Sequence, residues 1–173
     1  MRMPLVLIKD YLLPMNKVYL LLGSNMGNSR QLLSTAIKHI ETFIGSVSRA
    51  SGIYVTAAWG HTNQPDFLNQ VIIIETTLDA DATLNNILEI EKKMGRVRTT
   101  KNAPRVIDID ILFFNKAVIN SRHLQVPHPL LQNRRFVLVP LNELSPGFKH
   151  PVLQQSIHQL LVNCPDKLDV KKF

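Results

Sequence analysis

The sequence predicts an α+β fold in which helices pack on a mainly antiparallel sheet. Short apolar runs of strand composition alternate with two longer segments of helical periodicity, in the order β-α-β-β-α-β. No repeat, low-complexity tract or Gly/Ser linker divides the 173 residues, an ordinary length for one domain. Hydrophobic residues make up 45% of the chain and charged residues 19%, which is enough apolar material for a core.

The first part of the chain predicts a strand, a helix and a second strand. An apolar run at 18–22 predicts the first strand, and a Gly-Ser-Asn turn follows it. Asn28 or Ser29 caps the helix, whose apolar residues have helical spacing, and Gly45 ends it. Residues 46–56 are rich in Ser, Val, Ile and Tyr and predict the next strand.

The middle of the chain predicts another strand and another helix. Residues 67–77 contain four consecutive β-branched residues at 71–74, which are typical of a buried strand. Asp79 or Asp81 caps the following helix, and Gly95 ends it. The side chains expected to point inward from this helix are Leu84, Ile87, Leu88 and Met94.

The last third predicts one long strand followed by short elements. Residues 106–114 form the strand, and 118–119 form a short partner strand across a turn at 115–116. From residue 127 onward, prolines break the chain into short helices and turns, and residues 156–162 form the last helix. This order of elements is typical of a ferredoxin-like sandwich.

Charge and cysteine content narrow the function class. The formal net charge of +7 suits nucleic acid, an anionic surface or a polyanionic small molecule such as a nucleotide. No apolar run approaches the roughly 18–20 residues that span a bilayer, and no signal-peptide cleavage site follows the N-terminal stretch. The single cysteine, Cys164, excludes an internal disulfide and cysteine-based metal sites, and it fits a reducing cytoplasm.

The clearest chemical signal is a pair of aspartates on the predicted strand 106–114. Residues two apart on a strand share a face, so Asp108 and Asp110 project side by side while the isoleucines between them face the core. Carboxylates about 6–7 Å apart along a strand can hold Mg²⁺, whose coordination shell the oxygens of a polyphosphate would complete. By itself the pattern also fits an amphipathic strand with a solvated polar edge.

Arginines precede these aspartates. Arg96, Arg98 and Arg105 lie in a polar segment between the second helix and the acidic strand, and such segments are often lids. Guanidinium groups bind phosphate oxygens in a bidentate manner. Alone, the segment is equally well a solvated basic loop, but cations next to two carboxylates favour a Mg²⁺–polyphosphate site. His128 and Arg134 are candidate further donors.

Residues 56–69 combine aromatic side chains, Trp59 and Phe67, with amides such as Asn69. This mixture suits a flat heterocycle that stacks on a ring and hydrogen-bonds at its edge, although a turn with one packed aromatic fits equally well. The P-loop, the dinucleotide fingerprint and the kinase signatures are absent. Mg²⁺ and arginines would therefore have to hold the phosphates of a nucleotide.

In this order, the segments resemble the 6-hydroxymethyl-7,8-dihydropterin pyrophosphokinases of folate biosynthesis. The resemblance covers roughly residues 18–161 and is most specific in the Arg-x-x-Asp-x-Asp segment at 105–110 and the Pro-His pair at 127–128. It implies a monomeric, cytoplasmic transferase with a ferredoxin-like fold. Such an enzyme transfers pyrophosphate from ATP to the pterin hydroxymethyl group and releases AMP. Residues 1–14 are then expected to be an extension of unknown role, and 15–173 the single pyrophosphokinase domain.

The resemblance also implies residue roles. Asp108 and Asp110 would bind two Mg²⁺ ions, and with Arg96 and Arg105 they would form the catalytic set. The nucleotide contacts would come from Glu91, Arg96, Arg98, Arg105, Ile111, His128 and Arg134. The pterin would be bound by Thr56, Ala57, Trp59, Phe67, Asn69 and Phe136, the two phenylalanines stacking on its faces.

Two other function classes compete with this interpretation, an RNA-binding module on the same sheet architecture and a Mg²⁺-dependent nuclease. The aromatic RNP1 pattern of RNA recognition motifs is absent, and two carboxylates within a strand repel phosphates unless a metal intervenes. We therefore expect small-molecule substrates, and neither nucleic acid nor membrane as a partner. Release of AMP from ATP in the presence of the pterin separates the three classes.

Overall fold

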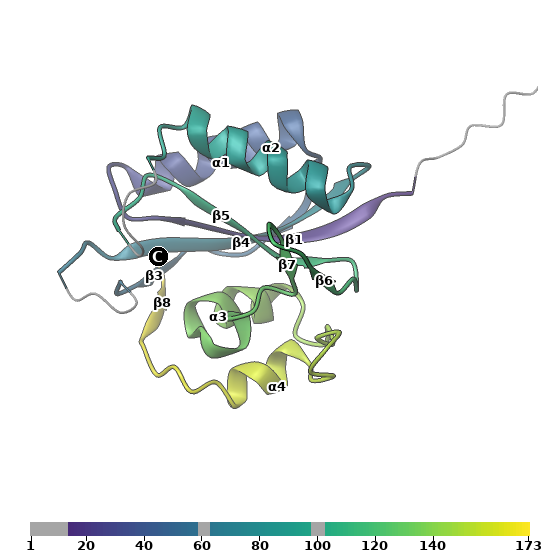
Figure 1. Cartoon of the computed structure of the whole chain (residues 1–173). Coiled ribbons are helices and arrows are strands. Elements are labelled where there is room, and N and C mark those ends of the chain that lie inside the picture. The colour runs from purple at the N-terminus through teal and green to yellow at the C-terminus, as the bar shows by residue number, and fades with distance from the viewer. Residues whose placement is uncertain (1–13, 59–62, 98–102) are drawn as a thin grey trace, which may run out of the picture.

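The computed structural model describes residues 14–58, 63–97 and 103–173. Its main sheet is antiparallel, in the order β5-β1-β4-β3-β8, with β2 also paired to β4 (Figure 1). The strands of this sheet are β1 (Asn16–Ser24), β2 (Ser46–Ala50), β3 (Tyr54–Thr56), β4 (Phe67–Thr76), β5 (Asp108–Phe114) and β8 (Val170–Lys172). Two further strands, β6 (Ile119–Asn120) and β7 (Gln125–Val126), pair only with each other.

Helices cover both faces of the sheet (Figure 1). One face carries α1 (Ser29–Phe43) and α2 (Ala80–Lys93). The other carries α3 (Arg135–Leu144) and α4 (Ile157–Val162), which follow a short 3₁₀ turn, η1 (Leu131–Asn133). The predicted α+β class and the ferredoxin-like order of elements are confirmed. The layer formed by α3 and α4 covers the second face of the sheet, in addition to the ferredoxin-like elements. Within the described ranges, no helix is long and apolar enough to cross a membrane.

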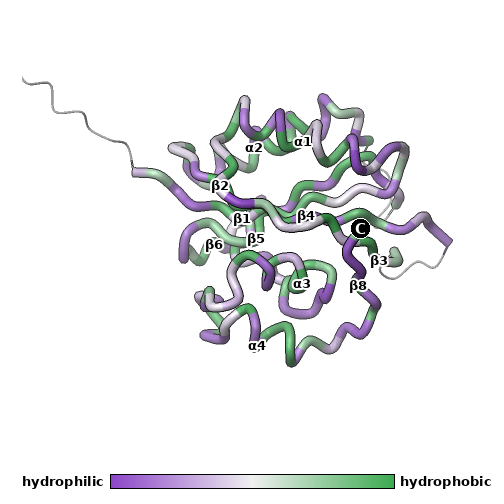
Figure 2. The backbone as a smooth tube through the Cα atoms, turned by 180° about the vertical axis from the view of Figure 1, so that it is seen from behind, coloured by the Kyte–Doolittle hydropathy of each residue, from purple (hydrophilic) through white to green (hydrophobic). Residues whose placement is uncertain are grey.

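The central strand β1 contributes to two separate hydrophobic cores because its side chains alternate between faces. Val18, Leu20 and Leu22 pack in the core beneath α1 and α2. Tyr19 and Leu21 pack in the core beneath α3 and α4. A strand buried on both faces needs a continuous apolar run, which is what β1 and β4 have. In Figure 2 these strands lie between the two helix layers, and hydrophobic and hydrophilic residues alternate along α1 and α2.

Three helices begin at capping side chains, and the sequence indicated those of α1 and α2. The side chain of Asn28 accepts a hydrogen bond from the Gln31 N–H at the start of α1, and that of Asp79 caps α2 in the same way. Ser156 and Gln159 form a reciprocal capping box at the start of α4. These caps satisfy backbone N–H groups that have no partner within their own helix.

The predicted single strand over 46–56 is wrong, because residues 51–53 separate β2 from β3. Ser51 causes the interruption by bonding twice to one residue of β4. Its N–H donates to the carbonyl oxygen of Val71 (2.9 Å), and its Oγ accepts from the Val71 N–H (3.0 Å). β2 and β3 therefore still pair with successive parts of β4, on either side of this interruption.

Three smaller expectations are also corrected. Leu88 is 37% exposed, because the buried face of α2 follows Thr83, Ile87 and Ile90. The acidic strand begins at Asp108 rather than at residue 106. Residues 119–120 pair with β7 and not with the acidic strand β5.

Gly45 allows the close approach of β2 to β4. A Cβ atom on Gly45 would lie 2.2 Å from the carbonyl oxygen of Glu75 and 2.9 Å from the Cβ of Thr76. Gly45→Ala is therefore expected to lower the free energy of unfolding by about 1–3 kcal/mol, the usual cost of overpacking. In the matched control Gly147→Ala, the added Cβ would meet no described atom within 4 Å, so the change should stay below about 1 kcal/mol. Denaturant unfolding followed by circular dichroism measures both variants, and equal stabilities would contradict the packing argument.

Candidate active site

A cavity open to solvent lies where β1, β4 and β5 meet on the α3 side of the sheet, with about 650 Å³ of empty space when the open solvent at its mouth is included. The cavity brings together Thr56, Ala57, Phe67, Asn69, Arg105, Asp108, Asp110, Arg134 and Phe136, all predicted as site residues. Of the other predicted residues, Glu91, Arg96, Ile111 and His128 lie outside this lining, whereas Trp59 and Arg98 lie outside the described residues.

The sheet register places the two halves of the cavity on either side of β1. Gly23 of β1 lies opposite Asn69 of β4 and opposite Asp108 of β5. A Cβ atom on Gly23 would lie 3.1 Å from Asn69 Oδ1 and 3.9 Å from Phe67 Cδ1. The floor between the two halves is therefore open because the residue there has no side chain. Gly23 was not predicted as a site residue, although a glycine within a strand often marks such a close approach.

The predicted alternation along the acidic strand is confirmed. Ile107 and Ile109 are 0% and 4% exposed, and both pack in the core beneath α1 and α2. Asp108 and Asp110 point to the opposite face and line the cavity. One strand therefore carries core residues on one face and two carboxylates on the other.

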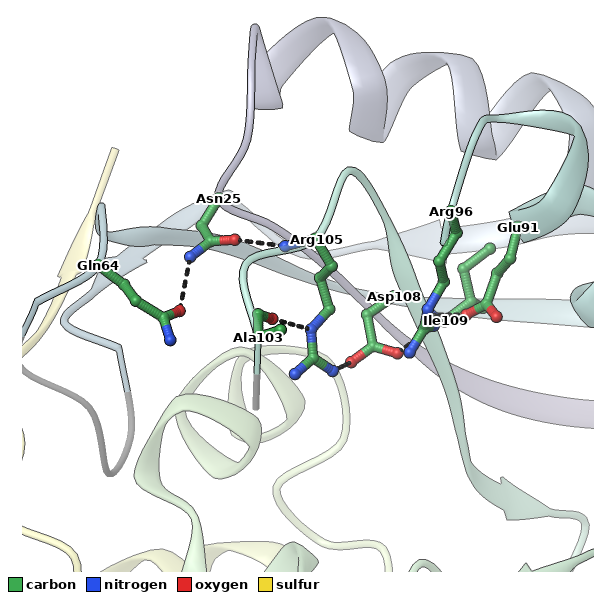
Figure 3. Close-up of polar contacts among 8 residues, drawn as sticks. All are labelled: Asn25, Gln64, Glu91, Arg96, Ala103, Arg105, Asp108 and Ile109. Carbon is green, nitrogen blue, oxygen red and sulfur yellow. Dashed lines mark hydrogen bonds and ion pairs between the residues drawn. The ribbon is translucent and has the colours of Figure 1, made fainter. Parts of the chain in front are cut away.

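Asp108 lies between two arginines (Figure 3). Its Oδ1 accepts a hydrogen bond from Arg96 Nη1, and its Oδ2 accepts one from Arg105 Nη1, each at 2.5 Å. Arg96 also forms an ion pair with Glu91, which is 3% exposed and accepts a hydrogen bond from the Ile109 N–H at 2.9 Å. Arg105 Nε donates to the carbonyl oxygen of Ala103. The result is a continuous chain of charges from α2 to the cavity.

Asp110 has a different environment. Burial, followed by the nearby charge of Asp108, raises the pKa of Asp110 to about 7, and the opposing charges of Arg134 and Arg96 only partly offset this effect. A cation between the two carboxylates would relieve their repulsion. Two carboxylates open to a cavity are oxygen ligands that fit Mg²⁺. In the described ranges no third His, Cys, Asp or Glu joins them, so further ligands would come from water or phosphate.

His128 is a neutral hydrogen-bond donor beside this cluster. Burial, together with the charge of Arg134, lowers the pKa of His128 to about 4. Its Nδ1 accepts a hydrogen bond from the Leu130 N–H at 3.2 Å, so in the neutral ring the proton sits on Nε2. Its backbone N–H donates to the carbonyl oxygen of Leu112, which holds the residue next to β5. His128 can therefore donate a hydrogen bond to an anion without carrying a charge.

The other half of the cavity is aromatic. Phe67, at the start of β4, and Phe136, in the first turn of α3, both line it. The guanidinium of Arg105 lies 5.9 Å from the ring centre of Phe67, and that of Arg134 lies 5.8 Å from the ring centre of Phe136. The aromatic half and the charged half thus share two arginines.

Asn69 is an oriented polar group in the aromatic half. It is 3% exposed, and its Nδ2 donates to Thr56 Oγ1 at 2.9 Å. The Thr56 hydroxyl therefore sets the orientation of the amide, whose Oδ1 is the group nearest to the open floor above Gly23. Gln64 also lines the cavity. It was not predicted as a site residue, although it belongs to the same amide-rich segment.

The side chain of Ile111 lies on the face away from the cavity. It is 5% exposed and packs in the core beneath α1 and α2. Its backbone offers a different contact. The Ile109 N–H points away from β1 and donates to Glu91, and residues two apart on a strand point their backbone groups to the same side. The N–H and C=O of Ile111 therefore face the outer edge of β5.

Comparisons with known proteins agree on one family. The sequence profile of the 7,8-dihydro-6-hydroxymethylpterin-pyrophosphokinase family matches residues 19–146. A 2-amino-4-hydroxy-6-hydroxymethyldihydropteridine pyrophosphokinase of Aquifex aeolicus is 39% identical over 145 residues, which cover 84% of this chain and 90% of that protein. The enzyme of the same name from Methylorubrum extorquens is 41% identical over 133 residues, covering 76% and 84% of the two chains.

Longer relatives match over only part of their length. The folic acid synthesis protein FOL1 of Dictyostelium discoideum is 39% identical over 153 residues, which are 87% of this chain but 23% of that protein. Among solved structures, wild-type HPPK-DHPS of Plasmodium falciparum superposes with a TM-score of 0.73 at 20% identity, covering 87% of this chain and 45% of that chain. This likeness supports the fold.

The two aspartates should affect stability in opposite directions in the metal-free protein. Asp108→Asn removes the partner of two arginines and is expected to lower the free energy of unfolding by about 1–3 kcal/mol. Asp110→Asn removes a buried charge next to the like charge of Asp108 and is expected to raise the free energy of unfolding by about 1 kcal/mol. Urea unfolding at pH 8 with a chelator present measures both variants. A shift in the same direction for the two would contradict the charge arrangement.

Proposed function

The chain belongs to the 7,8-dihydro-6-hydroxymethylpterin-pyrophosphokinase family, and we propose that it transfers pyrophosphate from ATP to the hydroxymethyl group of 6-hydroxymethyl-7,8-dihydropterin and releases AMP. Such an enzyme is an ATP-dependent diphosphotransferase of tetrahydrofolate biosynthesis. The observation that carries the proposal is a single cavity that joins an aromatic, amide-lined half to a half containing two aspartates and arginines. The two halves suit the two substrates.

The aromatic half suits the pterin. The rings of Phe67 and Phe136, which both line the cavity, would stack on a flat bicyclic heterocycle. Asn69 Oδ1 would accept a hydrogen bond from an amino or N–H group at the edge of the pterin, since the Thr56 hydroxyl fixes the amide orientation. Ala57 lines the same half of the cavity. Stacking binds the ring, and the amide selects its orientation.

The charged half suits ATP. Arg105 and Arg134 line the cavity, and His128 offers an uncharged Nε2–H donor beside them. The outward-facing N–H and C=O of Ile111 provide a donor and an acceptor for a nucleobase, in the manner of a strand edge, and Glu91 lies next to this edge. We therefore infer nucleotide contacts from Glu91, Arg105, Ile111, His128 and Arg134, whereas Arg98 lies outside the described residues.

Mg²⁺ is the proposed cofactor, with two ions held by Asp108 and Asp110. When bound, these ions would neutralise phosphate charge and make the pterin hydroxyl more acidic. Arg96 and Arg105 now pair with Asp108. If a bound cation neutralised Asp108, both guanidinium groups would become available for phosphate oxygens. The residues of the chain thus contribute by positioning and charge neutralisation, and none of them has to act as a strong base.

The proposed enzyme acts as a cytoplasmic monomer on these small molecules, with neither nucleic acid nor a membrane as a partner. One chain supplies both halves of the cavity, which is consistent with a monomer. The single cysteine is consistent with a reducing compartment.

The decisive assay measures AMP release. AMP should form only when ATP, Mg²⁺ and the pterin are all present, and a chelator should stop the reaction. Asp108→Asn and Asp110→Asn should each lower the rate by about 10²–10³-fold, the range seen when one electrostatic group of a transition state is lost. Asp79→Asn is the matched control. Position 79 lies outside the cavity lining, and asparagine is as good an N-cap for α2 as aspartate. Wild-type protein that cleaves nucleic acid, or that releases no AMP with the pterin, would contradict the proposal.

The stacking role of Phe136 can be tested by calorimetry. Phe136→Ala should weaken pterin binding by about 1–3 kcal/mol, the range for losing a base–aromatic stack, and should change ATP binding little. Phe43→Ala serves as the control, since Phe43 is 46% exposed at the end of α1 and is not part of the cavity lining. An equal loss of affinity for both ligands would instead indicate a collapsed site.

A further inference from the structure

Asn25 is a buried polar residue to which neither the sequence analysis nor the proposed function assigns a role. It follows directly after β1 and is 4% exposed. A buried amide has to find hydrogen-bond partners within the protein. The partners of Asn25 come from two segments that lie far from it in the sequence, one in each half of the cavity (Figure 3).

The first set of hydrogen bonds holds Arg105. The Arg105 N–H donates to Asn25 Oδ1 at 2.9 Å, and the Asn25 N–H donates to the carbonyl oxygen of Arg105 at 3.2 Å. This pair of bonds anchors the backbone of Arg105 to the end of β1. The guanidinium of the same residue reaches Asp108 Oδ2 at 2.5 Å. Asn25 therefore helps to fix the backbone position of Arg105, the arginine that we infer to bind phosphate.

The second set holds the segment before β4. Asn25 Nδ2 donates to Gln64 Oε1 at 3.3 Å and to the carbonyl oxygen of Pro65 at 3.2 Å. Gln64 lines the cavity, and Phe67 follows three residues later as one of its aromatic walls. Asn25 Nδ2 thus holds the segment that lines the pterin half of the cavity.

We propose that Asn25 is a positioning residue that couples the pterin half of the site to the Arg105 half. The amide is planar and rigid, so a displacement of the group bonded to Oδ1 moves the group bonded to Nδ2. Asparagine is a short side chain with a separate donor and acceptor at its end, whereas aspartate lacks the donor. The inference rests on the proposed function, because the two halves matter as a pair only if one reaction uses both substrates.

Asn25→Asp tests the pterin side selectively. The variant keeps an acceptor for the Arg105 N–H, but it places a carboxylate oxygen against the oxygens of Gln64 and Pro65. The KM for the pterin should rise about tenfold, the effect of losing two ordinary hydrogen bonds. The KM for ATP should change less than about twofold, because the bonds to Arg105 remain. The factor by which a non-hydrolysable ATP analogue tightens pterin binding, measured by calorimetry, should fall toward one.

Asn25→Ala removes both sets of side-chain bonds. It should raise the KM for the pterin and also lower kcat, since Arg105 is no longer held against the end of β1. The loss of an acceptor for a backbone N–H will also reduce stability, so Asn25→Asp carries the test if the alanine variant does not fold.

Asn28 offers a matched control three residues away. It is exposed, caps α1 and does not line the cavity. Asn28→Asp preserves a good capping group and should leave KM, kcat and the coupling factor unchanged. Asn28→Ala should lower thermal stability alone, which is how a purely structural asparagine in this turn behaves.

Three results would overturn the coupling role. They are an Asn25→Asp variant with the wild-type pterin KM and coupling factor, one that loses only stability, and one that loses only kcat. If the wild-type protein is active, each of these results contradicts the inference about Asn25 but leaves the proposed function standing. A wild-type protein that releases no AMP contradicts the proposed function and this inference together.

Discussion

The carboxylate of Asp108 is the group on which the arrangement of the site depends. It accepts hydrogen bonds from Arg96 and Arg105, and Arg96 is held from the other side by Glu91, whose carboxylate also receives a backbone N–H of β5. Two cations that close together are stable only because an anion lies between them. The arginines are thus kept near the cavity in a compact, ion-paired arrangement, and a ligand that competes for Asp108 releases them. The positions of Arg96 and Arg105 are in this way linked to the ligand state of Asp108.

The strand β1 imposes a second constraint, because it lies between the strands that carry the two halves of the cavity. Gly23 pairs with Asn69 on one side and with Asp108 on the other. Strand spacing then fixes the separation of the amide and the carboxylate, since neighbouring strands lie about 4.7–4.9 Å apart. The missing side chain at Gly23 keeps the space above this pair open. The sheet therefore sets the geometry, while the segments at its end supply Arg105 and Gln64.

Local patterns in the sequence predicted most of the fold and many of the residues that line the cavity, whereas contacts between distant residues could not be predicted from them. The i,i+2 rule placed Asp108 and Asp110 on one face because alternation depends only on the strand itself. Leu88 was misplaced because two helical stripes fit the same apolar residues, and only packing of α2 on the sheet and α1 selects one. The role of Asn25 stayed hidden because its partners Gln64 and Arg105 lie 39 and 80 residues away.

The overall charge of the protein does not explain the charge of its site. The charges of three arginines balance those of three carboxylates in this part of the site, namely Arg96, Arg105 and Arg134 with Glu91, Asp108 and Asp110. These six described residues are formally neutral, so the net charge of +7 comes from the rest of the chain. Two divalent cations and a tetra-anionic nucleotide also sum to zero, so the proposed ligands would leave this balance unchanged. A neutral site avoids burying net charge, which is costly in a recessed cavity. The distributed positive surplus can still attract an anionic nucleotide over about 10 Å of screened field, and the balanced cluster then determines how it binds.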